Sequence, residues 1–251
     1  MIAPGFPAGL SPTRKLFHAD PGATATTARV LATRGDLIIL DRTIFYAESG
    51  GQVSDTGTID AIPVLEVAKH GGNPVKIERS GLDPIYVNTG TFITHRVPSP
   101  DSFEVGQTVA LEIDGSRRAR ISVHHTAAHF VFEVLRRYVL ETSGEQLFTR
   151  SCMIDHEHCR FDLADDIPAD AVAGLEAQVN ALMADGGPIE MFADTRCDDV
   201  YYWTYRDVVI PCGGTHVARS EDIGPVSLRR RSKGRSNTRI TALLNGAAEP
   251  I

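Results

Sequence analysis

The pattern of hydrophobic and polar residues changes once along the chain, close to Asp114. Before that point, short runs rich in Val, Ile and Leu are closely separated by Gly and Pro, which is typical of strands joined by tight turns. Ala28–Ala32 and Leu37–Leu40 predict a hairpin around Gly35. Further strands are expected at Thr58–Leu65, Val75–Ile77, Gly90–His95 and Thr108–Ile113. Strands at this spacing predict a small β-barrel or sandwich.

Beyond Asp114 the apolar residues follow a helical spacing. The segment Arg117–Leu140 has few Gly or Pro residues, and its apolar side chains recur three and four positions apart, which places them on one helix face. Gly144 is expected to end this helix, and Pro168–Met183 predicts a second one. A strand pair is expected between the helices, at Ser151–Ile154 and Cys159–Leu163. The chain is therefore expected to be an α+β protein.

These two patterns predict three parts, with the main junction near residue 115. Residues 1–11 are rich in Pro and Gly and are expected to form a flexible arm. Residues 12–115 are expected to form a β-barrel domain, and residues 116–251 an α+β domain. With 251 residues and a hydrophobic content of 42%, the chain has enough apolar material for packed cores.

The composition also limits the partners and the compartment. The formal net charge of -7 argues against non-specific coating of nucleic acid, which depends on neutralising phosphates, but it allows a local basic patch. No segment approaches the ~20 apolar residues of a membrane span, and the first ten residues lack the features of a signal peptide. A cytoplasmic protein without membrane contact is expected, whose four cysteines are thiols or metal ligands. Monomer and homodimer are both open.

Two histidines and a Cys–His pair stand out as candidate metal ligands. His125 and His129 are four residues apart in the first helix, which places both imidazoles on one face. Cys212 and His216 are also four apart, and the two glycines between them tolerate a tight bend, including positive φ. Nitrogen and sulfur ligands of this kind are those that zinc prefers. A metalloprotease is not expected, because Thr126 stands where that class has its glutamate base.

The number of ligands raises a question about the chemistry. Four protein ligands around tetrahedral zinc are typical of a closed structural site, whereas catalysis needs an open position. Three answers are open: one residue leaves the metal, the site expands when substrate binds, or His125 or His216 acts as a general base.

Other residues with metal-binding side chains have simpler interpretations. Asp155–Cys159 lies between two expected strands and is interpreted as a polar hairpin turn. His124 points about 100° away from His125 on a helix and is not expected to be a ligand. Cys152 and Cys197 are interpreted as ordinary small residues. The aromatic run at residues 201–205 favours buried packing over base stacking.

Around these residues the sequence resembles the alanyl-tRNA editing domain, in particular its free-standing form, the AlaX family. The HTAAH segment His125–His129 is similar to the first motif of that family, and the CGGTHV segment Cys212–Val217 is similar to the second. The FYAESGGQ segment Phe45–Gln52, followed by Asp55–Gly57, is similar to the glycine-rich motif that precedes the editing domain. The resemblance covers most of the chain.

The resemblance implies a β-barrel followed by an α+β editing domain of the threonyl/alanyl-tRNA synthetase type. It implies a zinc ion held by His125, His129, Cys212 and His216. It also implies ATP-independent hydrolysis of mischarged tRNA(Ala), with Ser-tRNA(Ala) and Gly-tRNA(Ala) as substrates bound by their acceptor end. Because a chain of 251 residues that begins at the barrel has no room for an aminoacylation domain, it is expected to edit in trans.

Within this interpretation each candidate residue has an expected role. Zinc can activate water, polarise a carbonyl or orient the substrate, and His125, His216 and Thr126 are expected to take part in catalysis. Thr126 can hydrogen bond a serine hydroxyl of the substrate, or it can bond to a carbonyl of its own helix. Further substrate contacts are expected from Gly50, Gly51, Gln52, Gln146, Arg229, Arg230 and Lys233. Phosphate contacts are also expected from the rest of that basic run, Arg231, Arg235 and Arg239, and from Arg117, Arg118 and Arg120, the alternative being a solvated face.

The chain departs from the family at the strand that lines the amino-acid pocket. The family often has Gln-x-Gly-Ser there, whereas this chain has the FTRS segment Phe148–Ser151, with Gln146 two residues before it. The departure leaves two alternatives open. One is a zinc-dependent hydrolase of another aminoacyl-tRNA or aminoacyl ester. The other is a non-catalytic tRNA-binding module, against which the complete His/His/Cys/His set argues.

Overall fold

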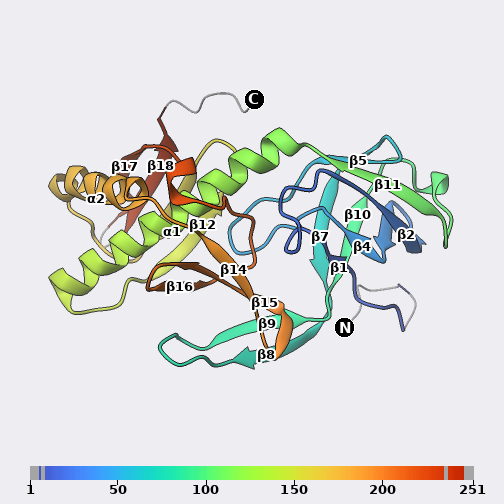
Figure 1. Ribbon diagram of the computed structural model, residues 1–251, viewed down its shortest axis with the longest axis horizontal. Coiled ribbons are helices and arrows are strands. Elements are labelled where there is room, and N and C mark those ends of the chain that lie inside the picture. Colours follow the sequence, from blue (N-terminus) through green and yellow to red (C-terminus); the bar gives the residue numbers. More distant parts are fainter. Residues whose placement is uncertain (1–5, 7–8, 235–236, 246–251) are drawn as a thin grey trace.

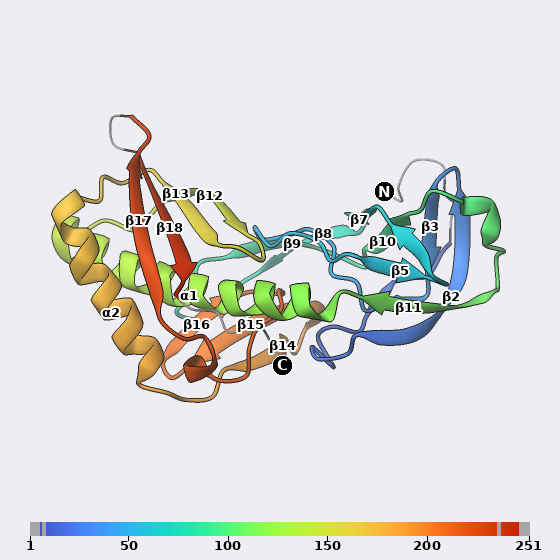
Figure 2. The ribbon, with the colours of Figure 1, turned by 90° about the horizontal axis from the view of Figure 1, so that it is seen from above.

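A computed structural model describes residues 6, 9–234 and 237–245 of the chain, without the side chains of residues 100 and 198. Most of the arm expected at residues 1–11 lies outside this description. The described molecule is long, with a barrel at one end, an α+β part at the other, and one helix running between them (Figures 1 and 2). None of the described helices is long and apolar enough to cross a membrane.

The barrel end is a curled sheet of seven strands in the order β6-β5-β11-β2-β3-β10-β7, beside a short parallel pair β1-β4. Alternate residues of β2 are buried, as expected for a strand with one face toward a core. The strands are β1 (Arg14–Lys15), β2 (Ala25–Arg34), β3 (Leu37–Leu40), β4 (Arg42–Thr43), β5 (Gly57–Ile59), β6 (Ile62–Val64), β7 (Glu66–His70), β10 (Phe92–Arg96) and β11 (Thr108–Ile113). This confirms the expected barrel.

Two features of the barrel differ from the sequence prediction. The single strand expected at Thr58–Leu65 is wrong: β5 and β6 form a hairpin there, turning at Asp60 and Ala61 with φ of 47° and 64°. Neither residue is a glycine, so the turn leaves no typical sequence signal. In addition, β8 (Asn73–Ile77) pairs with an unexpected strand, β9 (Ile85–Thr89), in a hairpin that leaves the barrel and lies along β15 (Figure 1).

The α+β end has α1 (Gly115–Ser143) between two antiparallel sheets, one in the order β12-β13-β18-β17 and one in the order β14-β15-β16 (Figure 2). The second helix, α2 (Val172–Ala184), packs against α1 and β17. The strands are β12 (Thr149–Ile154), β13 (Cys159–Leu163), β14 (Glu190–Asp194), β15 (Cys197–Tyr205), β16 (Val208–Pro211), β17 (Val226–Ser232) and β18 (Thr238–Leu244). Short 3-10 turns occupy Pro100–Ser102, Ala169–Ala171 and Ser220–Asp222.

The long helix α1 has clear capping residues at both ends. The carboxylate of Asp114 accepts a hydrogen bond from the backbone N–H of Arg117, and Gly144 ends the helix with φ of 74°. The predicted helix at Arg117–Leu140 is confirmed and is extended slightly at both ends. With 29 residues, at about 1.5 Å per residue, α1 is about 44 Å long and reaches from the barrel into the other end of the molecule.

Each end has its own hydrophobic core, one around residues 28–113 and one around residues 127–242. The two ends also share buried polar contacts. Arg118, in the first turns of α1, is 3% exposed and forms a salt bridge with buried Asp55 of the barrel. Its guanidinium also donates to the carbonyl of Ile44. The prediction that Arg118 contacts a tRNA phosphate is therefore wrong, because its guanidinium is buried and paired within the protein. The division into domains 12–115 and 116–251 stays a prediction.

Candidate metal centre

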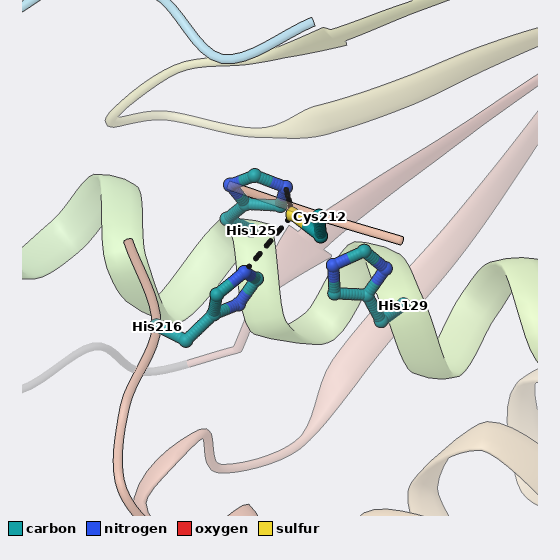
Figure 3. A group of neighbouring side chains, drawn as sticks. All are labelled: His125, His129, Cys212 and His216. Atoms are coloured by element: carbon teal, nitrogen blue, oxygen red, sulfur yellow. Dashed lines mark hydrogen bonds between the residues drawn. The ribbon is translucent and has the colours of Figure 1, made fainter. Parts of the chain in front are cut away.

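The four candidate ligands come together at the middle of α1 (Figure 3). His125 and His129 lie one turn apart on the helix, and their side chains are 3% and 9% exposed. Cys212 follows the last residue of β16, and its backbone N–H is bonded to the carbonyl of Tyr201. The turn after it carries His216 back toward the helix. We call these four residues, His125, His129, Cys212 and His216, the His/Cys cluster.

The spacing within the His/Cys cluster fits one metal ion. One ligand atom from each residue lies within 4.8 Å of all the others. The Cys212 sulfur lies 3.4 Å from His125 Nε2 and 3.3 Å from His216 Nε2. Tetrahedral bonds of about 2.0–2.3 Å place neighbouring ligand atoms roughly 3.3–3.8 Å apart. His129 Nε2 is buried and has no hydrogen-bond partner among the described residues, which is the state expected of a nitrogen reserved for a metal.

Burial sets the protonation of the His/Cys cluster. It lowers the pKa of His125 to about 3, and it lowers the pKa of His129 and of His216 well below the usual value. The three imidazoles are therefore neutral and can offer a lone pair. Burial raises the pKa of the Cys212 thiol to about 12. The thiol must lose its proton when a metal binds, so metal binding at this site releases a proton.

Of the two glycines between Cys212 and His216, only Gly214 is required by its surroundings, for a reason that the sequence did not indicate. Positive φ was expected to matter, but neither Gly213 nor Gly214 has it. Instead, a Cβ at Gly214 would lie 2.1 Å from His125 Cε1, whereas a Cβ at Gly213 would meet nothing closer than 3.6 Å. Gly214 thus allows the backbone to pass directly against the His125 imidazole.

The glycine-rich motif of the barrel reaches the His/Cys cluster through Gln52. Gly50 and Gly51 have φ of 60° and 86°, and a Cβ at Gly51 would lie 2.9 Å from the carbonyl oxygen of Cys152. Gln52 itself is fully buried, and its Oε1 lies 2.6 Å from His125 Nδ1. The turn therefore inserts a barrel side chain next to His125 of the other end. Gln52 contacts the Nδ1 atom of the His125 ring, and its side chain is buried.

Thr126 lies against the Nδ1 atom of His216. Its hydroxyl is fully buried and donates to the carbonyl of Ser122, which is the second of the two roles expected for it. The same oxygen accepts the backbone N–H of Val217 and lies 3.3 Å from His216 Nδ1. These three contacts use both lone pairs and the proton of the Thr126 hydroxyl. Recognition of a substrate hydroxyl by Thr126 stays a prediction, and it requires one of these bonds to open.

A cavity of about 640 Å³ is lined by residues of both ends of the molecule and by His216 of the His/Cys cluster. His216 and Gly214 lie in its wall, together with apolar side chains that include Ile189 and Met191. His18 of the barrel end also lines it, and its ring stacks on Tyr201 at 3.8 Å. Burial lowers the pKa of His18 to about 4, so the ring is neutral. His18 was not predicted as a site residue, because its position in the sequence has no regular spacing to the residues of the cluster.

The remaining candidate substrate contacts are not brought to the His/Cys cluster. Gln146 is exposed in the loop before β12 and lines a second cavity of about 1170 Å³. Arg229 and Lys233 are exposed, whereas Arg230 is half-buried and pairs with Asp166. Arg239 pairs with Asp162, and Arg235 lies outside the described residues.

The simpler interpretations agree with the structure. Asp155–Cys159 is a hairpin turn between β12 and β13, in which the Asp155 carboxylate accepts the backbone N–H groups of Glu157 and His158. His124 Nδ1 faces the carbonyl of Arg120, away from the cluster. Three aromatic residues of β15 are fully buried and form part of the packing, namely Tyr202, Trp203 and Tyr205.

Comparison with known proteins identifies the family. The alanyl-tRNA editing protein AlaX-M of Pyrococcus horikoshii is 34% identical over 234 residues, which cover 91% of this chain and 96% of the relative. The chain belongs to the alanyl-tRNA editing protein family. The match extends over both ends of the molecule, which confirms the resemblance noted in the motifs.

Alanine–tRNA ligases are also similar to this chain. The ligase of Bordetella petrii is 34% identical over 214 residues, and that of a Caulobacter species is 29% identical over 238 residues. The chain spans only 23% and 25% of the length of these two ligases. The family model described as tRNA synthetases class II (A) matches residues 18–117, which is the barrel end together with the start of α1.

Proposed function

We propose that this protein is an aminoacyl-tRNA deacylase that hydrolyses mischarged tRNA(Ala), with Ser-tRNA(Ala) as the main substrate and Gly-tRNA(Ala) as a second. The observation that carries the proposal is the complete His/Cys cluster, whose His216 lines a cavity, in a chain that matches an alanyl-tRNA editing protein over nine-tenths of its length. The reaction is attack of water on the ester carbonyl. The bond to the ribose oxygen breaks, and that oxygen leaves as a hydroxyl.

The donor set favours zinc as the resident ion. Three imidazoles and one thiolate combine ligands that suit zinc in a four-coordinate site, whereas magnesium and calcium prefer oxygen ligands. When bound, zinc would polarise and orient polar groups of the substrate. His125 and His216 fit the role of ligands better than that of general bases, because each directs its Nε2 at the Cys212 sulfur and has its Nδ1 engaged elsewhere.

The chain's own residues supply the binding site around that ion. The apolar walls formed by Ile189, Met191 and Val217 would shelter the ester from bulk water, and His216 of the cluster lines the same cavity. The bound substrate would enter between the barrel end and α1, where Phe17 and His18 line the cavity. Arg229 and Lys233, which are exposed, remain candidates for contacts with tRNA phosphates farther from the cluster.

The test is a panel of tRNA(Ala) charged with serine, glycine or alanine, together with a mischarged tRNA of another identity. We expect rapid release of serine, slower release of glycine, little release of alanine, and loss of all activity after treatment with a chelator and recovery with zinc. Unchanged Ser-tRNA(Ala) would refute the substrate assignment. A His125→Ala/Cys212→Ala double variant that still hydrolyses at the normal rate would refute the metal-dependent mechanism.

A further inference from the structure

Gln52 belongs to the barrel but makes its contacts with the metal centre of the other end. It is 73 residues away from His125 in the sequence and 163 away from Thr215, and it is hydrogen bonded to both. Its side chain is fully buried, so these bonds form without competition from solvent.

The orientation of the Gln52 amide follows from its contacts. One end of the amide lies 3.0 Å from the backbone N–H of Thr215, which can only donate a hydrogen bond. The atom facing it must therefore be the oxygen, Oε1. The other end then donates from Nε2 to the Thr215 hydroxyl at 3.1 Å. A flipped amide would direct two donors at each other in a buried site, so the flip is excluded.

This orientation fixes the tautomer of His125. Because Oε1 can only accept, the His125 Nδ1 that lies 2.6 Å from it must carry the proton. The lone pair of the neutral imidazole is then on Nε2, which is the atom that faces the Cys212 sulfur at 3.4 Å. The imidazole thus presents its lone pair to the metal position before any metal arrives.

Two neighbouring glycines make this contact possible. A Cβ at Gly214 would lie 2.7 Å from Gln52 Oε1 as well as against the His125 ring. Gly51 permits the turn before Gln52, where its carbonyl accepts the N–H of Ile154 and the N–H of Val53 bonds back to the Ile154 carbonyl. The barrel loop is held against β12 by these two bonds, so Gln52 does not depend on its own side chain for its position.

We infer that Gln52 is a positioning residue for the metal centre: it holds His125 in the tautomer and rotation that bind the ion. This role rests on the proposed metal site, but it does not depend on which tRNA is the substrate. Outer-shell partners of metal-bound histidine commonly change metal affinity by about 10- to 100-fold when they are removed. The Gly-Gly-Gln turn would accordingly act on the ion through His125.

The test compares zinc dissociation constants of Gln52→Met, Gln52→Glu and the wild type, measured by competition with a chromophoric chelator. Methionine has a similar length and no strong acceptor, so we expect zinc to bind about 10- to 100-fold more weakly. Glutamate restores the acceptor, and we expect affinity within about threefold of the wild type. Gln107→Met is the matched control, because the Gln107 amide likewise accepts a backbone N–H, that of Glu104, and donates to a side-chain oxygen, that of Asp60, within the barrel end.

A second measurement separates positioning from simple loss of stability. Nitrogen-15 NMR of histidine in the zinc-free wild type should show His125 protonated at Nδ1, and in Gln52→Met that tautomer should lose its dominance. Wild-type zinc affinity in Gln52→Met, or an Nε2-protonated His125 in the wild type, would overturn the inference. If wild-type protein fails to deacylate Ser-tRNA(Ala) while Gln52→Met loses zinc, the proposed substrate fails and the role of Gln52 stands.

Discussion

Substitution of Gly214 by alanine tests whether the close packing at the metal centre is required. The new Cβ would lie 2.1 Å from His125 Cε1 and 2.4 Å from its Nδ1. Ordinary contact begins at 3.4 Å, so the ring must move by about 1.3 Å, the difference between the two distances. Metal–ligand distances in proteins vary by only about 0.2 Å. The displaced imidazole therefore cannot stay on an ion that the other three residues hold.

Gly213→Ala is the internal control. A Cβ at Gly213 would be 3.6 Å from His18 Cε1, which is ordinary contact, and neither glycine has the positive φ that would strain an alanine. We expect the Gly214 variant to bind zinc at least about 100-fold more weakly, whereas the Gly213 variant should keep wild-type affinity. Chelator competition and metal analysis of the purified proteins give both values. Equal zinc affinity in the two variants would refute the packing argument.

Three further predictions address the rest of the molecule. Arg118→Met leaves the buried carboxylate of Asp55 without its positively charged partner. We expect the free energy of unfolding, measured in urea, to fall by about 3–5 kcal/mol. Burial lowers the pKa of His95 from 6.5 to about 4. Between these values the unfolded chain binds a proton at His95 that the folded chain does not, so acidification from pH 6.5 to pH 4 should lower the free energy of unfolding by about 3 kcal/mol through His95 alone. Measured with chelator present, His95→Gln should show a shallower decline over this range, and an identical decline would contradict the assignment. Neutralising Arg229, Arg231 and Lys233 should make the plot of log binding constant for tRNA against log salt concentration less steep, by about 0.7–0.9 for each lost phosphate contact. An unchanged slope would show that these residues do not contact tRNA phosphates.

The parts of the fold that were predicted correctly have local signals. The helix around His125 and His129 follows from apolar spacing, and its end follows from Gly144. The neighbouring positions of His125 and His129 on α1 could be predicted because a helix brings positions i and i+4 together.

The features that were missed depend on contacts between distant parts of the sequence. The bond between Gln52 and His125 joins positions 73 residues apart, and nothing in the local pattern assigns the amide a partner. The requirement at Gly214 arises from an approaching side chain, so it leaves no mark on the backbone angles. His18 reaches the cavity wall only because the barrel end packs beside α1.

The insertion of Gln52 into the opposite end of the molecule has a consequence for hydrogen exchange. If the docked Gln52 strengthens metal binding, as we infer, then by mass action the ion favours the states in which the barrel loop is docked. Amides of Val53 and Ile154, which bond across this junction, should therefore exchange more slowly when metal is bound, although neither residue supplies a ligand. The amide exchange rate of the loop around Gln52 would then depend on whether the metal centre is occupied, although the loop belongs to the barrel end.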